Sequence, residues 1–548
     1  MSKACNATTR CASPSRPAWR ALAQAAEDAG NDGRFAQAIR LARRAVAAAP
    51  DQPAASIVLA ELLRKRGCGG AAAKVLRRAL KHAGERAELW NHLGLALRDD
   101  CREDESLAAF RRGARLEPEG RWSRTNMAFG LMRQPGDRAT ATFAALGQAG
   151  EAAEVGLGLF CDRFPHTYGF LIQQFATYLR HFPDAVAYSF GRRVLEPYGP
   201  EQFDAAMAGF GTSHPDLAGR VTQLVPVLEA PPGDAPHVRI ETRGGRFRRP
   251  RLAHNIFAMN ADLFRPLYET LGIPFTFTLN PGGAFRLDHP HSDDRLRRVF
   301  DSALFRKVIV TYPLTHDYII DRFQVPDERI ALIPGTIVVE RLLDAHRAPK
   351  RRFGVHKDTL DVCFVGMRYS PTGADKGYDR FIAAMTLLAP RVPALRVHVV
   401  GNFDVDTVAC DALAGRIAFH GSRDQRWLAA FHAGMDAIVS PNVADQLAKG
   451  AFDGFPVTSC IEAGMCGVAL FATDPMGLNM WLRDGVDYVA IDRDPRRIAD
   501  CLEAWLATPE RLYALAESGA RRFHAHWGEA AQMGPRVALM TEMLNREG

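Results

Sequence analysis

The stretch Asp361-Val-Cys-Phe-Val-Gly366, followed by Lys376-Gly377-Tyr-Asp-Arg-Phe381, decides the fold that this sequence predicts. It reads as a short apolar strand that breaks at a glycine, then a loop, then an amphipathic helix. A glycine after a strand lets a phosphate approach the backbone, and the first N–H groups of a helix can bind it. The loop residues Arg368 and Lys376 can together neutralise a diphosphate. The stretch therefore predicts one βα unit of a sheet that binds a phosphorylated ligand.

The residues that follow continue the same alternation of strand and helix. Strands are expected at 396–400, 435–441 and 468–472, with a turn at 417–421 and a helix over 424–433. In such a doubly wound sheet, the loops at the carboxyl ends of the strands line a ligand crevice. Glu462, near the start of a later helix, has a carboxylate suited to the two hydroxyls of a ribose.

This order of motifs closely resembles the donor domain of family 4 glycosyltransferases, which have the GT-B fold of two Rossmann-like domains. The family's lines are V-G-R-x-x-x-x-K-G for the phosphate loop and E-G-F-[GP]-x-x-x-x-E-A for the donor loop. The resemblance implies these donor-binding residues: Gly366, Arg368, Lys376, Gly377, His420, Gly454, Phe455, Pro456 and Glu462. Within this set, Arg368 and Lys376 would hold the diphosphate. His420 lies in a turn that resembles the family's F-x-G turn near the nucleobase. The alternative is that the two cations are surface charges and that Glu462 is an ordinary helix-start acid.

The donor loop departs from the family in two ways. Asp453 stands where the first glutamate usually is, and it lies nine positions before Glu462 instead of eight. The stretch between Pro441 and Asp453 is also longer than usual. Asp453 is expected to be catalytic by resemblance, while the identity of the sugar stays open.

A second α/β pattern precedes the first. From residue 238, strands are expected at 238–241, 274–279, 307–311 and 329–333, which predicts a parallel sheet. The runs 252–280 and 305–337 resemble the acceptor-side domain of the same family. His254 is our second catalytic candidate there, and a structural histidine is the equal alternative. Asn280 stands where the family usually carries a histidine.

The front of the chain repeats with a period of 34 residues. Pro50, Gly84 and Pro118 each close a helical run, and Gly33, Ala38, Ala45 and Leu59 recur as Gly67, Ala72, Ala79 and Leu93. This period is typical of tetratricopeptide repeats, whose W-x2-L-G line is similar to 90–97. A generic Ala-rich bundle is the alternative. Such repeats commonly bind an extended peptide or another protein.

The predicted organisation is α/β, with two Rossmann-like GT-B domains behind an all-α repeat module. The expected boundaries are: 15–120 tetratricopeptide-like repeats; 121–235 a mostly helical connection, with a helix over 157–179 and a loop at 231–233; 236–345 the acceptor domain; 346–530 the donor domain; and 531–548 a C-terminal helix.

Composition indicates the cellular location and the kinds of partner to expect. The ten cysteines, Cys5 among them, form no CxxC pair, and the start of the chain lacks the apolar core of a signal peptide. We therefore expect a cytoplasmic protein. The net charge of +7 has no dense basic block, so it does not indicate nucleic acid, but it is compatible with peripheral membrane contact. The oligomeric state is open.

The resemblance implies a retaining glycosyltransferase that uses a nucleotide sugar as substrate, with no cofactor and no metal. Its acceptor could be a protein, such as flagellin or another surface protein, that the repeats recruit. A lipid-linked or surface polysaccharide is an alternative acceptor. A non-catalytic scaffold, in which only the repeats act, is the alternative from another class.

Overall fold

The computed structural model describes most of the chain. The described residues are 18–31, 35–65, 68–100, 102–133, 137–149, 151–165, 169–190, 200–229, 237–335, 338, 340–370 and 372–546. Gly33, Gly67, Cys5, the loop at 231–233 and residues 336–337 fall outside them. The chain divides into two compact units, Met1–Met127 and Ala128–Gly548, which we call the repeat unit and the α/β unit.

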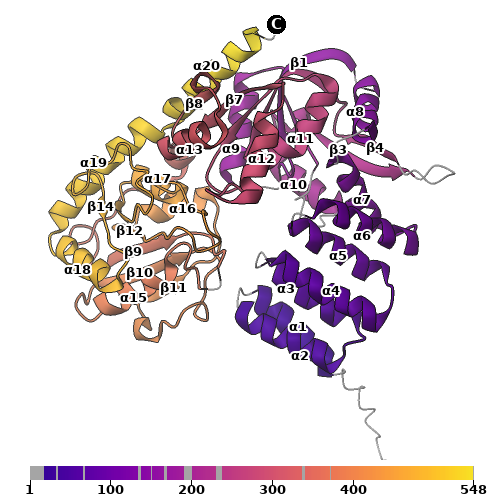
Figure 1. The fold of residues 1–548 in the computed structure, drawn as a ribbon. Coiled ribbons are helices and arrows are strands. Elements are labelled where there is room, and N and C mark those ends of the chain that lie inside the picture. The colour runs from indigo at the N-terminus through magenta and orange to yellow at the C-terminus, as the bar shows by residue number, and fades with distance from the viewer. Residues whose placement is uncertain are drawn as a thin grey trace, which may run out of the picture. The chain divides into compact units, whose positions relative to one another are not determined.

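The repeat unit is a row of helices in which each packs on the next (Figure 1). They are α1 Ala18–Asn31, α2 Phe35–Ala48, α3 Pro53–Lys65, α4 Gly69–Ala83, α5 Ala87–Asp99, α6 Glu103–Leu116 and the start of α7 Arg121–Arg133. Pro50 and Pro118 follow the ends of α2 and α6, and Gly84 caps α4 with φ of 76°. Ala38 and Ala72 are both fully buried, so small side chains let neighbouring helices approach closely. The helical repeat is confirmed.

The first α/β domain is built on an eight-stranded sheet of order β4-β3-β2-β1-β5-β6-β7-β8, parallel except for β4. Its strands are β1 Glu151–Cys161, β2 Val186–Ser189, β3 Val221–Glu229, β4 His237–Arg243, β5 Arg248–Ile256, β6 Phe275–Leu279, β7 Phe305–Val310 and β8 Ile330–Leu332. Its helices are α8 Asp137–Ala149, α9 Gly169–His181, α10 Pro200–Ser213, α11 Ala258–Leu271, α12 Pro290–Phe300 and α13 Pro313–Phe323. The next helix, α14 Glu340–His346, packs on α16 Gln425–His432 of the second domain.

The expectation of a mostly helical connection over 121–235 is corrected by this sheet. The strands β1, β2 and β3 come from that segment, so the domain includes residues from 151 onward and not only from 236. The expected helix over 157–179 is strand β1 followed by α9. A strand buried on both faces reads as a continuous apolar run, and periodicity cannot distinguish it from a buried helix.

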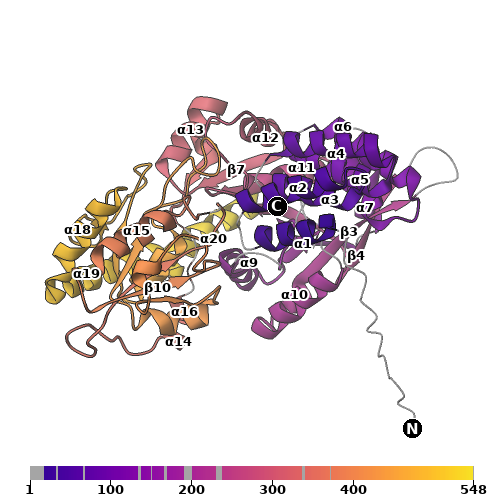
Figure 2. The ribbon, with the colours of Figure 1, turned by 90° about the horizontal axis from the view of Figure 1, so that it is seen from below.

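The second α/β domain has a fully parallel six-stranded sheet of order β11-β10-β9-β12-β13-β14. Its elements are β9 Leu360–Val365, α15 Tyr378–Leu388, β10 Leu395–Val400, β11 Ile417–Phe419, α16 Gln425–His432, β12 Ala437–Ser440, α17 Thr458–Met465, β13 Ala469–Ala472, β14 Val489–Ala490, α18 Pro495–Leu506 and α19 Pro509–Trp527. In sequence order this is 3-2-1-4-5-6, the Rossmann topology. The first sheet has the same order once β4 and β8 are set aside. Helices cover both faces of the second sheet (Figures 1 and 2).

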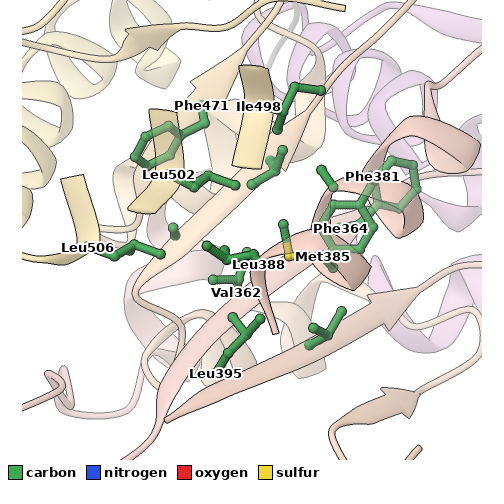
Figure 3. Close-up of a cluster of buried hydrophobic side chains, with 14 of the residues drawn as sticks. Val362, Phe364, Phe381, Met385, Leu388, Leu395, Phe471, Ile498, Leu502 and Leu506 are labelled. Carbon is green, nitrogen blue, oxygen red and sulfur yellow. The ribbon is translucent and has the colours of Figure 1, made fainter. Parts of the chain in front are cut away.

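The core of the second domain lies between its sheet and the helices α15 and α18. Val362 and Phe364 of β9, Phe381 of α15, and Ile498 and Leu502 of α18 are all buried in one cluster (Figure 3). Burying side chains of this size contributes about 1.5–3 kcal/mol each. This packing fixes β9 and α15, and therefore the loop between them.

The last helix returns to the first domain. Helix α20, Glu529–Arg546, buries Met533, Met540 and Met543 in the core formed by α9 and β5 (Figure 1). The fully buried Arg536 donates hydrogen bonds of 3.1 Å to the carbonyls of Ile333 and Gly335. Within the described residues, none of the helices is long and apolar enough to cross a membrane.

Candidate active site

A large cleft lies within the α/β unit, with a volume of about 1380 Å³. Residues of both α/β domains line it. From the first domain, Asn280 and Tyr312 follow the carboxyl ends of β6 and β7. From the second, Gly366, Gly401 and Asn442 follow those of β9, β10 and β12. Loops at the carboxyl ends of two parallel sheets therefore face one cavity, which is where such sheets bind ligands.

Two glycines bring the loops after β9 and β10 together. Gly401 has φ of 131°, and a Cβ added to it would lie 1.8 Å from the carbonyl oxygen of Gly366. Both glycines line the cleft, and only a residue without a side chain fits at position 401. Gly366 therefore lies at the cleft, and its binding of the donor stays a prediction.

Lys376 and Asp453 form an ion pair in the cleft. The Lys376 Nζ lies 2.6 Å from Asp453 Oδ2 and 5.4 Å from the centre of the Tyr369 ring. Both charged residues line the cavity, and their side chains are 16% and 35% exposed. The structure thus brings the predicted phosphate-binding lysine to the predicted catalytic carboxylate, although 77 residues separate them.

Arg368 does not accompany Lys376 into the cleft. It is only 9% exposed, and its Nη1 donates a 2.8 Å hydrogen bond to Thr407 Oγ1. Its backbone N–H bonds to Asn402 Oδ1 at 2.7 Å. Met367 directly follows Gly366 and lines the cavity in its place. Arg368 is outside the cleft lining because the motif places its arginine right after the glycine and this chain places it one position later; its contact with a diphosphate stays a prediction.

Glu462 is a buried carboxyl at the cleft wall. It lies on α17, is 4% exposed, and accepts a 2.6 Å hydrogen bond from Gln425 Nε2 of α16. Burial raises the pKa of Glu462 to about 7, although the Gln425 bond acts in the opposite direction. Both residues line the cavity. Gln425 was not among the predicted site residues. Its position directly after the helix cap Asp424 was the sequence feature that could have indicated it.

The donor loop is held against the first domain. A Cβ on Gly454 would lie 2.2 Å from Tyr312 Oη, and the N–H of Phe455 bonds to the same phenol. Gly454 and Pro456 line the cleft, whereas the Phe455 ring packs on Tyr488 at 5.5 Å and is not part of the lining.

Two more predicted donor residues lie behind the cleft lining. His420 hydrogen-bonds to His398 at 3.1 Å, and burial, then His398 and Arg423, lower its pKa. The following loop, residues 422–426, lines the cavity instead. Gly377, with φ of 69°, packs under Pro441, whose carbonyl oxygen would lie 1.8 Å from an added Cβ. Neither residue is in the cleft lining, so both support the site from behind.

His254 is a structural histidine. It is fully buried on β5, its Nδ1 hydrogen-bonds with Thr276 at 2.8 Å, and its Nε2 lies 3.3 Å from Thr278 Oγ1. Burial, and secondarily the charge of Arg536, lower its pKa to about 3. The catalytic expectation for His254 is corrected, since strand β5 turns this side chain into the core and away from the cleft.

No metal centre is evident in the described part of the chain, where no three His, Cys, Asp or Glu side chains gather to hold an ion. The absence of a metal requirement stays a prediction.

Part of the cleft is lined by first-domain residues that the sequence analysis does not predict as site residues. Phe170 and Arg180 of α9, Phe210 of α10, and His214 and Arg341 line it. All but Arg341 come from the segment for which the sequence predicts a helical connection. The aromatic residues of 157–179 were the available signal.

Comparison with known proteins identifies two domains. Residues 359–508 match the family described as glycosyl transferases group 1, and residues 31–96 match a tetratricopeptide repeat. No curated protein matches the chain. The first match supports glycosyltransferase activity.

Several solved structures are similar in fold, all at low identity. Sucrose-phosphate synthase of Thermosynechococcus elongatus is 15% identical over 72% of this chain and 98% of that one, with a TM-score of 0.47. Anabaena HepE in complex with UDP-glucose is 13% identical over 71% and 98%, with a TM-score of 0.48. A mutant Thermobaculum terrenum O-GlcNAc transferase is 12% identical over 96% and 98%, with a TM-score of 0.41. By its two family matches, the chain joins a group 1 glycosyltransferase domain to a tetratricopeptide-repeat segment.

Proposed function

We propose that the protein transfers a sugar from a nucleotide-sugar donor to a protein acceptor that its repeats recruit. The part of the proposal that concerns the donor rests on one observation: Lys376, Asp453 and Glu462 all line one cleft, within a group 1 glycosyltransferase domain. The acceptor half is supported by the repeat match at 31–96.

The donor would lie with its diphosphate at Lys376 and its ribose at Glu462. Lys376 would leave Asp453 to form charge-assisted bonds with the phosphates, and the loops held by Gly366 and Gly401 would approach them with their backbone. Asp453, released from Lys376, would then face the transferred sugar. An ionised Glu462 accepts hydrogen bonds from both ribose hydroxyls.

Positive charge near the leaving diphosphate is the catalytic contribution of this arrangement. It stabilises the charge that develops as the glycosidic bond breaks. We propose that Lys376 supplies this without a metal and that the product keeps the donor's anomeric configuration. Proton NMR of the anomeric signal of the product tests the stereochemistry, and activity in the presence of EDTA tests the metal requirement.

Donor turnover by the purified chain is the first test. A panel of nucleotide sugars is incubated with the protein, and release of the nucleoside diphosphate is measured. Lys376→Ala should lose about 1.5–3 kcal/mol of donor binding. Lys74→Ala, an exposed lysine of α4, is the matched control and should behave like the parent. Equal turnover by the parent and Lys376→Ala would refute the phosphate role, and no turnover of any donor would favour a non-catalytic scaffold.

A lipid-linked or surface polysaccharide remains the competing acceptor class. Adding each acceptor class to the donor reaction and following sugar incorporation distinguishes them.

A further inference from the structure

The cleft is larger than a donor needs. Its 1380 Å³ exceeds the roughly 300–1,000 Å³ of most ligand pockets, so there is room for a second molecule beside a nucleotide sugar. The additional space is the arm on the first domain, lined by Phe170, Gln173, Arg180, Phe210, His214 and Arg341. We call this the first-domain arm.

One wall of the first-domain arm is apolar. Phe210 and Phe257 are 4% and 8% exposed, and Phe170 packs edge-on against Phe257 with ring centres 6.1 Å apart. Gly209 on α10 also lines the cleft, and a Cβ added there would meet nothing within 4 Å. The wall therefore offers open space beside aromatic rings, which suits an aromatic or aliphatic side chain.

The other end of the first-domain arm is positively charged. Arg180 lies 3.5 Å from Asp216, and Arg341 lies 3.5 Å from Glu529, and neither carboxylate lines the cleft. His214 sits beside these cations and stacks on Phe210 with ring centres 4.7 Å apart. Burial, followed by the charge of Arg180, lowers the pKa of His214.

Negative charge is missing from this half of the cleft. The described first-domain residues that line it include Arg180, Arg286 and Arg341 but no aspartate or glutamate. Arg180 and Arg341 each have a carboxylate partner outside the lining, so the lining itself presents cations and no carboxylate, which favours an anionic ligand.

We infer that the first-domain arm selects an acidic peptide acceptor, in which the modified hydroxyl lies near an aspartate or glutamate and an aromatic or aliphatic residue. Arg180 and Arg341 would bind the acidic side chain, and the Phe170–Phe210 wall would take the apolar one. Gln173 and Ser213, which also line the arm, offer an amide and a hydroxyl to the peptide backbone. This inference rests on the proposed transfer to protein. A lipid phosphate would use the same cations but not these backbone partners.

The test compares synthetic peptides that share a central serine or threonine. One set carries glutamate and phenylalanine beside it, a second replaces glutamate by lysine, and a third replaces phenylalanine by alanine. The donor is the nucleotide sugar that the full-length parent hydrolyses fastest, and donor hydrolysis is recorded in the same reactions. The parent should prefer the glutamate peptide over the lysine peptide by about tenfold in kcat/KM, since partly exposed ion pairs contribute modestly.

Charge variants of the arm assign this preference to its residues. The double variant Arg180→Gln and Arg341→Gln should bring the ratio close to one, and Arg180→Glu with Arg341→Glu should reverse it. Because a ratio is compared, a general loss of activity does not imitate the result. Arg496→Gln, an exposed arginine of α18, is the matched control and should keep the parent ratio.

Three outcomes would overturn the inference. Donor hydrolysis with equal transfer to the glutamate and lysine peptides would remove the selection role while leaving the transferase proposal intact. Preferential transfer to a detergent-dispersed lipid phosphate would assign the cations to another acceptor class. No hydrolysis of any donor would instead refute the proposed function on which the inference rests.

Discussion

The buried carboxyl of Glu462 should make donor binding depend on pH. Its pKa of about 7 leaves it mostly protonated at pH 6, and only the ionised form accepts hydrogen bonds from both ribose hydroxyls. Nucleoside diphosphate affinity, measured by calorimetry, should therefore rise about tenfold between pH 6 and pH 8. Glu462→Gln should bind more weakly and lose this dependence, whereas Glu510→Gln, at an exposed position of α19, should keep it.

The same group affects folding stability in the opposite direction. The folded pKa of Glu462 lies above the ordinary value of 4.5, so its contribution is fully present below that value and is lost as the pH rises through 7. Urea titrations should show a smaller loss of unfolding free energy between pH 5 and pH 8 in Glu462→Gln than in the parent. An identical pH dependence in both proteins would contradict the raised pKa.

Asp453 should oppose diphosphate binding while it supports transfer. In the structure, Asp453 Oδ2 lies 2.6 Å from Lys376 Nζ, so a phosphate group that binds Lys376 has to displace the Asp453 carboxylate. Asp453→Asn should tighten nucleoside diphosphate binding by a few fold, the scale of a partly exposed ion pair, and yet reduce transfer strongly. Weaker binding of the diphosphate by this variant would show that the pair is not in competition with the ligand.

At the scale of elements, the junction of β9 and β10 depends on Gly401. A methyl group there would lie 1.8 Å from the Gly366 carbonyl at a φ of 131°, so the two loops must separate. Gly401→Ala should cost more than about 2 kcal/mol of unfolding free energy and weaken donor binding. Gly434→Ala is the matched control, because its nearest atom is 3.6 Å away and its φ is ordinary. Donor binding at parent affinity in Gly401→Ala would contradict the close approach.

A helix or strand can be predicted from the sequence when residues such as glycine mark its ends. The unit β9–loop–α15 was predicted because Gly366 and Gly377 bracket the loop. Strand β1 was missed because residues 155–161 form a continuous apolar run that is buried on both sides and carries no alternation. The positions of loop side chains were less predictable. Met367 and Arg368 are neighbours in the sequence, yet Met367 lines the cleft and Arg368 bonds to Thr407. The pairing of Lys376 with Asp453 depends on strand order, which no local pattern specifies.

At the scale of the whole molecule, the repeat unit should be separable from the α/β unit. The chain divides at Met127, and each unit has its own buried clusters. Deletion of residues 1–127 should leave a folded protein that binds nucleoside diphosphate and hydrolyses donor slowly, but it should lose transfer to the natural acceptor. Parallel assays of hydrolysis and transfer check this. Undiminished transfer would show that the repeats do not recruit the acceptor, and aggregation with loss of both activities would show a structural role.

The crossing of α20 has a mechanical consequence. The chain passes between the two α/β domains twice, once after β8 and once at Gly528, and Arg536 ties the second passage to the carbonyls of Ile333 and Gly335 in the first. Because the two passages lie side by side, we expect the domains to rotate mainly about the line that joins them. We therefore expect opening and closing of the cleft to follow mainly this one rotation. One fluorescence distance between labels on α12 and α15 would follow that whole movement.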